Sequence, residues 1–250
     1  MSDPNPPAND RRKPDVPEPL KRFYKTVSLR DEGGGRAAIL LDGRTLRTPA
    51  KAPLAVPEPI ASQMAAEWNA QDTHILPMTM PLTRLVNSAI DGVSTVIASV
   101  QDDLVAMAGN DLLVYRADRP DGLVARQNAL WDPLVQQTEA RFGVPLRITV
   151  GIMPVTQDPR LDNAVRAVLP GDPLPLAALH QLSTLTGSAL IALALAADEI
   201  DLDAAWAAAH VDEDWNIELW GKDEEAKARR AARREDAAAA ALVLLETRRL

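Results

Sequence analysis

The chain has 250 residues, a formal net charge of −8 and 46% hydrophobic residues. This length and composition allow a substantial core, so we expect one or two folded domains, with disorder only at the ends. The acidic balance argues against nucleic acid or an anionic membrane as the main partner, because both bind concentrated positive surfaces. The absence of cysteine excludes disulfides, thiolate metal sites and thiol redox chemistry.

Two segments could be mistaken for targeting or membrane signals. Residues 1–20 carry six prolines and mixed charges without an apolar stretch, which predicts a disordered lead and not a secretory signal or transit peptide. Residues 174–197 contain no Asp, Glu, Lys or Arg and are long enough to cross a bilayer. Polar residues dilute this segment, however, and it lacks basic or aromatic flanks, which favours one helix buried in a soluble core without membrane insertion.

Residues 22–56 have the pattern of an antiparallel meander. Short alternating or apolar runs are separated by a reversal at Gly33–Gly35 and by an Asp42-Gly43 turn. No Gly-Lys-Ser/Thr follows the glycine run, so turn formation explains it better than a phosphate loop does. Pro57 then predicts the start of a helix, and the proline-rich residues 74–81 predict an extended return that closes a first domain.

Helical periodicity dominates from residue 81 onward. It predicts helices at 82–93, 95–109, 122–143, 158–169 and 174–197, and a short extended connection within 146–155. Asp201 is expected to cap a helix that continues through Trp220. The last helix follows a left-handed Gly221, with a solvated arginine-rich middle and an apolar end that packs. The predicted fold class is therefore α+β, with a small β domain (21–80) before a larger helical domain (81–250).

The most unusual stretch is 206–234, which holds three of the five tryptophans, many carboxylates and a basic run. At about 100° per residue, one stripe of this helix contains Leu202, Trp206, His210, Ile217 and Trp220. Glu213 falls within that stripe, where its carboxylate would be desolvated unless an arginine, a backbone donor or a partner protein meets it. An internal salt bridge is the simpler interpretation, and partner binding is the alternative.

Catalytic patterns are weak. Histidines occur only at 74, 180 and 210, and neither a zinc-binding pair nor a Gly-x-Ser-x-Gly motif is present. Asp102, Asp103 and Asp111 could form a metal or acid/base site, although surface charge explains them equally well. We therefore predict neither a catalytic nor a metal site.

Eight segments occur in a fixed order along residues 22–234: RFYKTV, LLDGRTLRTP, AAEWNAQ, LPMTMPLTRLVNSAID, DLLVYRA, QNALWDPL, LTGSALIALAL and DEDWNIELWGKDEEA. Together they resemble the F₁-ATPase assembly chaperone family that binds the α subunit of ATP synthase, of the α-proteobacterial and mitochondrial type. The resemblance implies two domains, no catalytic activity, no cofactor, and transient protection of the unassembled α subunit before it pairs with β. The lead, which lacks transit-peptide character, indicates a bacterial cytoplasmic protein.

The resemblance also implies a partner-binding region near the carboxyl end. A transient cover for an apolar surface needs aromatic and apolar anchors bordered by charge, and reversible binding favours a modest, partly polar interface between a monomeric chaperone and its partner. Lys222 departs from the acid expected after Trp-Gly. The candidate contact or contact-shaping residues are Glu213, Asp214, Trp215, Glu218 and Trp220, with Glu224 and Glu225 as weaker candidates.

Two other classes of function remain open from the sequence. One is a small-molecule enzyme whose site lies in the cleft between the two domains, where pockets often form. The other is a structural subunit that stays in the mature ATP synthase.

Overall fold

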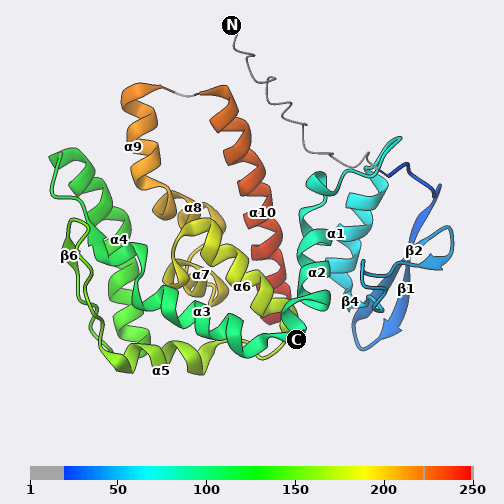
Figure 1. Cartoon of the computed structure of the whole chain (residues 1–250), viewed down its shortest axis with the longest axis horizontal. Coiled ribbons are helices and arrows are strands. Elements are labelled where there is room, and N and C mark those ends of the chain that lie inside the picture. Colours follow the sequence, from blue (N-terminus) through cyan, green and yellow to red (C-terminus); the bar gives the residue numbers. More distant parts are fainter. Residues whose placement is uncertain (1–19, 222, 249–250) are drawn as a thin grey trace, which may run out of the picture.

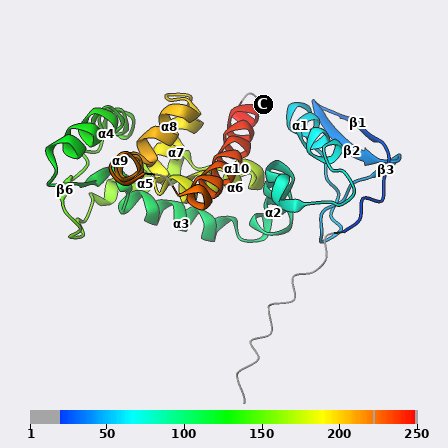
Figure 2. The ribbon, with the colours of Figure 1, turned by 90° about the horizontal axis from the view of Figure 1, so that it is seen from above.

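A small sheet forms one end of an elongated molecule, and an assembly of helices forms the other (Figures 1 and 2). The computed structural model describes residues 20–221 and 223–248, so the predicted lead up to residue 19 and the unusual Lys222 lie outside the described residues. The α+β class and the order of its two parts are as predicted. The buried apolar side chains of both parts nevertheless form one continuous cluster, from Tyr24 to Leu244.

The sheet is the predicted meander. Strands β1 (Val27–Gly33), β2 (Arg36–Leu41), β3 (Arg44–Thr45) and β4 (Val56–Pro57) form antiparallel pairs, with β2 bonded to each of the others. The turn between β2 and β3 places Asp42 at a φ of 48°. Its carboxylate accepts hydrogen bonds from the backbone N–H groups of Lys25 and Thr26 at 3.0 and 2.8 Å. These bonds hold the segment that enters β1 and lower the pKa of Asp42.

Helix α1 (Glu58–Asn69) packs on this sheet and begins directly after Pro57, as predicted. The expected extended path over 74–81 is confirmed at its start, where His74 forms an antiparallel β-bridge with Lys21, and is wrong at Pro77–Thr79, which forms a 3₁₀ turn. The Gln71 side chain organises this turn by accepting from the Leu76 N–H at 2.7 Å and donating to Thr79 Oγ1 at 3.1 Å. The proline pattern of residues 74–81 could not predict this turn, because the side chain that stabilises it lies outside the segment.

The middle of the chain alternates helices with two short strands. The elements are α2 (Pro81–Asp91), α3 (Ile97–Gly109), η3 (Leu112–Val114), β5 (Tyr115–Arg116), α4 (Asp121–Phe142), β6 (Thr149–Val150) and α5 (Pro159–Val168), with a further 3₁₀ turn, η2 (Val93–Thr95), after α2. The first turn of α2 is capped by Glu67 of α1, whose carboxylate accepts from the N–H groups of Leu82 and Thr83. Strands β5 and β6 pair in parallel, which confirms the short extended connection predicted within 146–155.

The apolar segment 174–197 forms two helices, α6 (Pro173–Thr186) and α7 (Ala189–Ala196), so the prediction of one helix is wrong. Gly187 ends α6 with a φ of 68°, and Ser188 caps α7. Asp111, which caps η3 far earlier in the chain, stabilises this break: its fully buried carboxylate accepts from the Ser188 hydroxyl at 2.6 Å and the Leu190 N–H at 3.0 Å. Surface charge is therefore the wrong explanation for Asp111, whose oxygens are occupied by helix capping.

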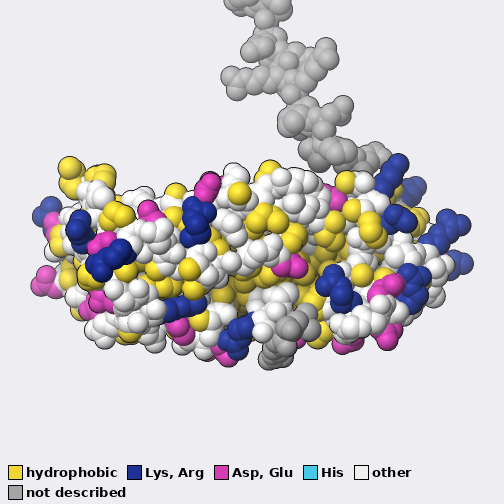
Figure 3. Space-filling view, turned by 90° about the horizontal axis from the view of Figure 1, so that it is seen from below, with side chains coloured by type: hydrophobic (Ala, Val, Ile, Leu, Met, Phe, Trp, Pro, Cys, Tyr) yellow, Lys and Arg dark blue, Asp and Glu magenta, His cyan; other side chains and the backbone are white. Residues whose placement is uncertain are grey.

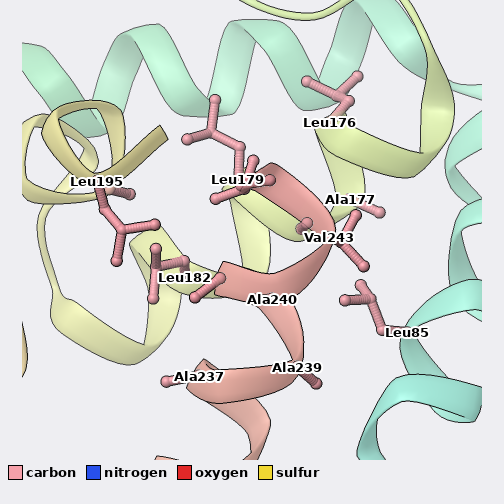
Figure 4. Packing of buried hydrophobic residues seen from close by; sticks show 14 of the residues in the cluster. Leu85, Leu176, Ala177, Leu179, Leu182, Leu195, Ala237, Ala239, Ala240 and Val243 are labelled. Atoms are coloured by element: carbon pink, nitrogen blue, oxygen red, sulfur yellow. The ribbon is translucent and has the colours of Figure 1, made fainter. Parts of the chain in front are cut away.

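Helix α10 (Glu224–Arg248) packs its apolar end against α6 and α2, as predicted. Ala237, Ala240 and Val243 are buried, and Figure 4 shows them gathered with leucines of α6 and with Leu85 of α2. The small alanine side chains allow the helix axes to approach closely, and the leucines fill the remaining space. None of the described helices is both long and apolar enough to span a membrane.

Burial gives Asp111 a distinctive pH dependence. Desolvation raises the pKa of its carboxyl to about 6, against 3.8 for the ordinary group, although hydrogen bonds from Ser188 and backbone N–H groups oppose the rise. Between pH 3.8 and about pH 6, the Asp111 carboxyl is therefore protonated in the folded protein but ionised in the unfolded chain. The stability that this protonation contributes is complete below pH 3.8 and is lost by about pH 6. We expect the unfolding free energy of the wild type, relative to Asp111→Asn, to fall as pH rises from about 4 to about 6. Urea unfolding at several pH values measures this difference, and a constant or rising difference would contradict the assignment.

Candidate functional site

The tryptophan-rich segment forms two helices, α8 (Leu202–Ala209) and α9 (Val211–Trp220). Asp201 caps α8 as predicted, but the expected continuous helix is wrong, because His210 adopts a φ of −116° and a ψ of 20°. The His210 ring stacks on Trp206 at 3.9 Å between ring centroids and lies buried, with Nδ1 2.9 Å from the Trp206 carbonyl oxygen. Burial lowers the pKa of this imidazole, so the ring fixes the bend in its neutral form near pH 7.

Because of this bend, the predicted apolar stripe from Leu202 to Trp220 does not form on one continuous helix. Trp206 stays in the core, whereas Trp220 at the end of α9 is 84% exposed. The Glu213 side chain is 42% exposed, and its carboxylate lies 3.9 Å from the Arg230 guanidinium. The salt-bridge interpretation of Glu213 is therefore confirmed only in part: Arg230 meets this carboxylate, but in a loose ion pair at the surface, of a kind worth at most about 1 kcal/mol.

One side of α9 is attached to α4. The guanidinium of Arg126 donates to both carboxylate oxygens of Glu218 at 2.8 Å and lies 5.4 Å from the centre of the Trp215 ring. These bonds lower the pKa of Glu218. The Gln127 amide donates to Asp212 at 2.7 Å. Trp215 and Glu218 therefore position the helix, and a bidentate pair of this kind also fixes its orientation.

The other side of α9 is attached to α10. Arg230 of α10 pairs with Asp214 of α9. Two neighbouring arginines of α10 bind other helices: Arg234 pairs with Asp203 of α8 and lies 5.6 Å from the centre of the Trp206 ring, and Arg233 donates to the Leu185 carbonyl oxygen of α6. The prediction of a solvated arginine-rich face is therefore wrong for Arg230 and Arg234, whose side chains are 21% and 28% exposed, whereas Arg233 is exposed as predicted. Sequence reasoning missed both Arg230 and Arg126 as positioning residues, because partners far apart along the chain leave no local signal.

The free end of α9 presents apolar side chains within an acidic border. Leu219 is 56% exposed beside Trp220. Gly221 has a positive φ of 85°, but its ψ of 177° is extended, so the predicted left-handed helical conformation is wrong. Asp223 accepts from the N–H groups of the first turn of α10, as predicted. The side chains of Glu224 and Glu225 are 85% and 80% exposed and pair with Lys227 and Arg229 of their own helix.

Grooves lie on both sides of α9. The groove toward α10 has a volume of about 170 Å³ and is lined by Glu213, Asp214, Ile217, Asp223, Ala226, Lys227 and Arg230. The groove toward α4 has a volume of about 480 Å³ and is lined by Arg126, Ala129, Leu130, Ala207, Val211, Asp214, Ile217 and Glu218. Figure 1 shows α9 and the start of α10 extending side by side away from the helical core. The arrangement suits binding to a protein surface; within 20–221 and 223–248, no group of three His, Asp or Glu residues could hold a metal ion.

Comparison with known proteins identifies a class of assembly chaperones. The model of the ATP12 chaperone protein family matches residues 21–139. Atp12 from Paracoccus denitrificans has 42% identical residues over 91% of this chain and 98% of its own, with a TM-score of 0.81, and a variant of it with lysine in place of an aspartate matches equally well. A protein from Agrobacterium tumefaciens, described as a candidate chaperone, has 45% identity over 91% of this chain and 86% of its own, with a TM-score of 0.85.

A more distant relative is the mitochondrial protein atp12 of Schizosaccharomyces pombe, which is 25% identical over 227 residues, or 84% of this chain and 77% of its own length. The identity and coverage of the Paracoccus and Agrobacterium structures are high enough to show the family. The chain belongs to the ATP12 chaperone family, which confirms the resemblance found in its sequence.

The contact between Gly122 and Trp215 tests whether α4 positions α9. A Cβ atom at Gly122 would lie 2.6 Å from Cη2 of the rigid indole ring, so Gly122→Ala is expected to displace Trp215 and destabilise the fold by about 1–3 kcal/mol. Without that contact, glycine to alanine in a helix is neutral or mildly stabilising, by at most about 1 kcal/mol.

Urea unfolding and tryptophan fluorescence measure the effect. Trp215→Leu provides the control, because the smaller side chain makes room: in that background Gly122→Ala should lose its penalty. A Gly122→Ala protein more stable than the wild type would show that α4 and Trp215 do not meet.

Proposed function

We propose that this protein is a molecular chaperone for assembly of the F₁ sector of ATP synthase, and that α9 and the start of α10 bind the unassembled α subunit transiently. Membership of the ATP12 chaperone family supports the assembly role. The observation that carries the binding surface is the end of α9, where Leu219 and Trp220 are 56% and 84% exposed beside several carboxylates. The choice of the α subunit rests on the sequence resemblance.

The physical requirements of such a chaperone support this surface. An unassembled subunit exposes the apolar surface that its neighbour will later cover, and such patches aggregate unless they are shielded. A large exposed aromatic side chain on a preformed helix can bury much apolar area at little conformational cost. The carboxylates around it keep the interface partly polar, which favours release when the β subunit arrives. We infer that the covered surface is the one that later faces β.

The candidate residues divide into two groups in this proposal. Trp220, Glu224, Glu225 and the half-exposed Glu213 are available to touch the α subunit. Asp214, Trp215 and Glu218 act by positioning α9, because their side chains are already engaged by α10 and α4. This division refines the sequence prediction, which did not separate contact from positioning.

The remaining parts of the proposal follow the same resemblance. We propose that residues 21–80 and 81–250 act as two domains, that the chaperone works as a monomer in the bacterial cytoplasm, and that it binds its partner without catalysing a reaction. The buried Asp111, one of the carboxylates considered for an enzymatic site, supports this view because its oxygens are used to cap helices.

Glu213→Lys tests the binding surface directly. Its loose, half-exposed ion pair predicts a change of at most about 1 kcal/mol in the unfolding free energy, whereas a lysine within an acidic border should repel the partner group that the carboxylate meets. We expect circular dichroism and melting close to those of the wild type, and loss of the α subunit from a pull-down out of cells that make α without β.

The matched control for this variant is Asp72→Lys, which makes the same charge change at an exposed position near the sheet. It should capture the α subunit normally. Co-expression of β should displace the wild-type chaperone. Collapse of the Glu213→Lys fold would instead indicate a structural salt bridge, and a chaperone found in purified ATP synthase at equal amounts with α would indicate a permanent subunit.

Trp220→Ala separates binding from stability in a second way. The indole is 84% exposed in the free chaperone, so its removal should leave the melting temperature unchanged. If this side chain anchors the α subunit, the dissociation constant should rise about thirtyfold, equivalent to about 2 kcal/mol. Titration of labelled variants with α measures the constant. Met78→Ala, at a position 73% exposed near the sheet, is the control, and equal affinities of the two variants would exclude Trp220 as an anchor.

A further inference from the structure

The sheet end of the molecule carries the opposite charge from the rest of the chain. Residues 20–57 contain eight Lys or Arg residues and three Asp or Glu residues, a surplus of five positive charges, although the whole chain has a net charge of −8. Figure 3 shows Lys and Arg side chains at the sheet end of the molecule. The field of this end therefore attracts acidic groups, whereas the field of the helical end repels them.

The cations of this end also differ from the others in their partners. In the described part of the chain, only Arg30 among these eight forms an ion pair, with Glu32. The other ion pairs found within residues 20–221 and 223–248 join residues of the helical part. The acid nearest to the turn, Asp42, already accepts bonds from Lys25 and Thr26. Among the described residues, seven of these eight cations therefore have no ion pair.

Part of this positive charge surrounds a groove with an aromatic wall. The groove has a volume of about 540 Å³ and is lined by Phe23, Tyr24, Leu41, Asp42, Arg44, Thr45, Leu46 and Arg47. Phe23 is 64% exposed, and its ring meets Tyr24 edge to face, with 5.4 Å between centroids. Tyr24 is itself fixed, because its hydroxyl donates to the Trp68 carbonyl oxygen at 2.6 Å. The exposed ring is thus held in place before any partner binds, which lowers the entropy cost of binding.

We propose that this groove, which we call the sheet groove, binds an acidic segment of the same client protein that α9 contacts; the inference rests on the proposed function. The cations Arg44 and Arg47 select carboxylates, and Phe23 offers an apolar contact to a neighbouring side chain. An acidic polypeptide fits better than nucleic acid, because one exposed aromatic ring is a poor stacking platform and the acidic helical end repels phosphates. When the client is bound at one end of the elongated chaperone, its second segment is held at a high effective concentration near the other end, which strengthens binding overall.

The test compares two double variants of the full chain with equal charge changes. Arg44→Glu/Arg47→Glu reverses the groove. The control variant Arg36→Glu/Lys51→Glu reverses two exposed cations at the same end of the molecule that do not line the groove. Arg36 lies at the start of β2, about 17 Å along the strand from Leu41, which lines the groove at the other end of β2. Titration of unassembled α subunit at several salt concentrations should give the groove variant an affinity about tenfold lower and a weaker salt dependence, with little change for the control variant. Equal affinities of the two variants would overturn the proposal.

Three further measurements keep this inference separate from the proposed function. A labelled peptide of alternating glutamate and phenylalanine should bind the wild type and Glu213→Lys equally, and should bind neither the groove variant nor Phe23→Ala. Preference for a thymidine oligonucleotide or for phosphatidylserine vesicles over this peptide would overturn the assignment, as would groove-dependent dimerisation in sedimentation. If the wild type failed to bind α yet bound the peptide in the groove, the α subunit would be the wrong client, but the assignment of the groove to acidic polypeptides would remain valid.

Discussion

The geometry of the candidate site depends on holding one short helix between two arginines. Helix α9 has ten residues, a length at which an isolated helix is marginal in water, and it buries only Val211 completely. Its orientation is fixed from outside, by Arg126 of α4 through Glu218 and by Arg230 of α10 through Asp214. Removing either arginine would leave a partly exposed acid with little energetic penalty, so these pairs act mainly by defining direction.

The bend at His210 makes this attachment possible. If α8 continued straight into α9, Trp220 would lie on the same stripe as Trp206 and would be drawn toward the core. The bend instead buries Trp206 beneath the His210 ring and directs the following residues outward. The neutral state of His210, maintained by burial, matters here, because a charged ring stacked in the core would be costly to desolvate. One residue thus separates a structural tryptophan from an exposed one.

The sequence predicted the local features of this architecture and missed those that depend on distant residues. The sheet turns at Gly33–Gly35 and Asp42-Gly43 and the cap at Asp201 were predictable, because each depends on residue types next to one another in the chain. The bend at His210 was not, since histidine carries no breaking preference of its own and tertiary stacking decides its conformation. The arginine-rich part of α10 was misjudged for a similar reason.

Breaks in the long apolar segment show the same limit. Gly187 and Ser188 are a reasonable end and cap, but a lone glycine in an apolar run is compatible with a continuous buried helix. The decisive partner is Asp111, 77 residues earlier, which binds the Ser188 hydroxyl. For the candidate site, the sequence singled out residues 206–234 but did not distinguish the side chains that face outward; their role in binding stays a prediction. The division into domains at residue 80 stays a prediction, and the single buried cluster shows that the two parts share a core.

An exposed tryptophan on a chaperone could also bind a second copy of the same chain. The charge around it opposes such binding: Glu224 and Glu225 follow the end of α9 and Glu213 lies in its first turn, so two copies that meet there bring like charges together as the apolar contact forms. A partner that lacks these acids meets the same apolar surface without that repulsion. The acidic residues around α9 thus favour binding to the apolar surface of another protein over binding to a second copy, although they also reduce the affinity for that protein. Because the repulsion is between exposed charges, it weakens as salt increases, and the selectivity of such a surface is greatest at low ionic strength.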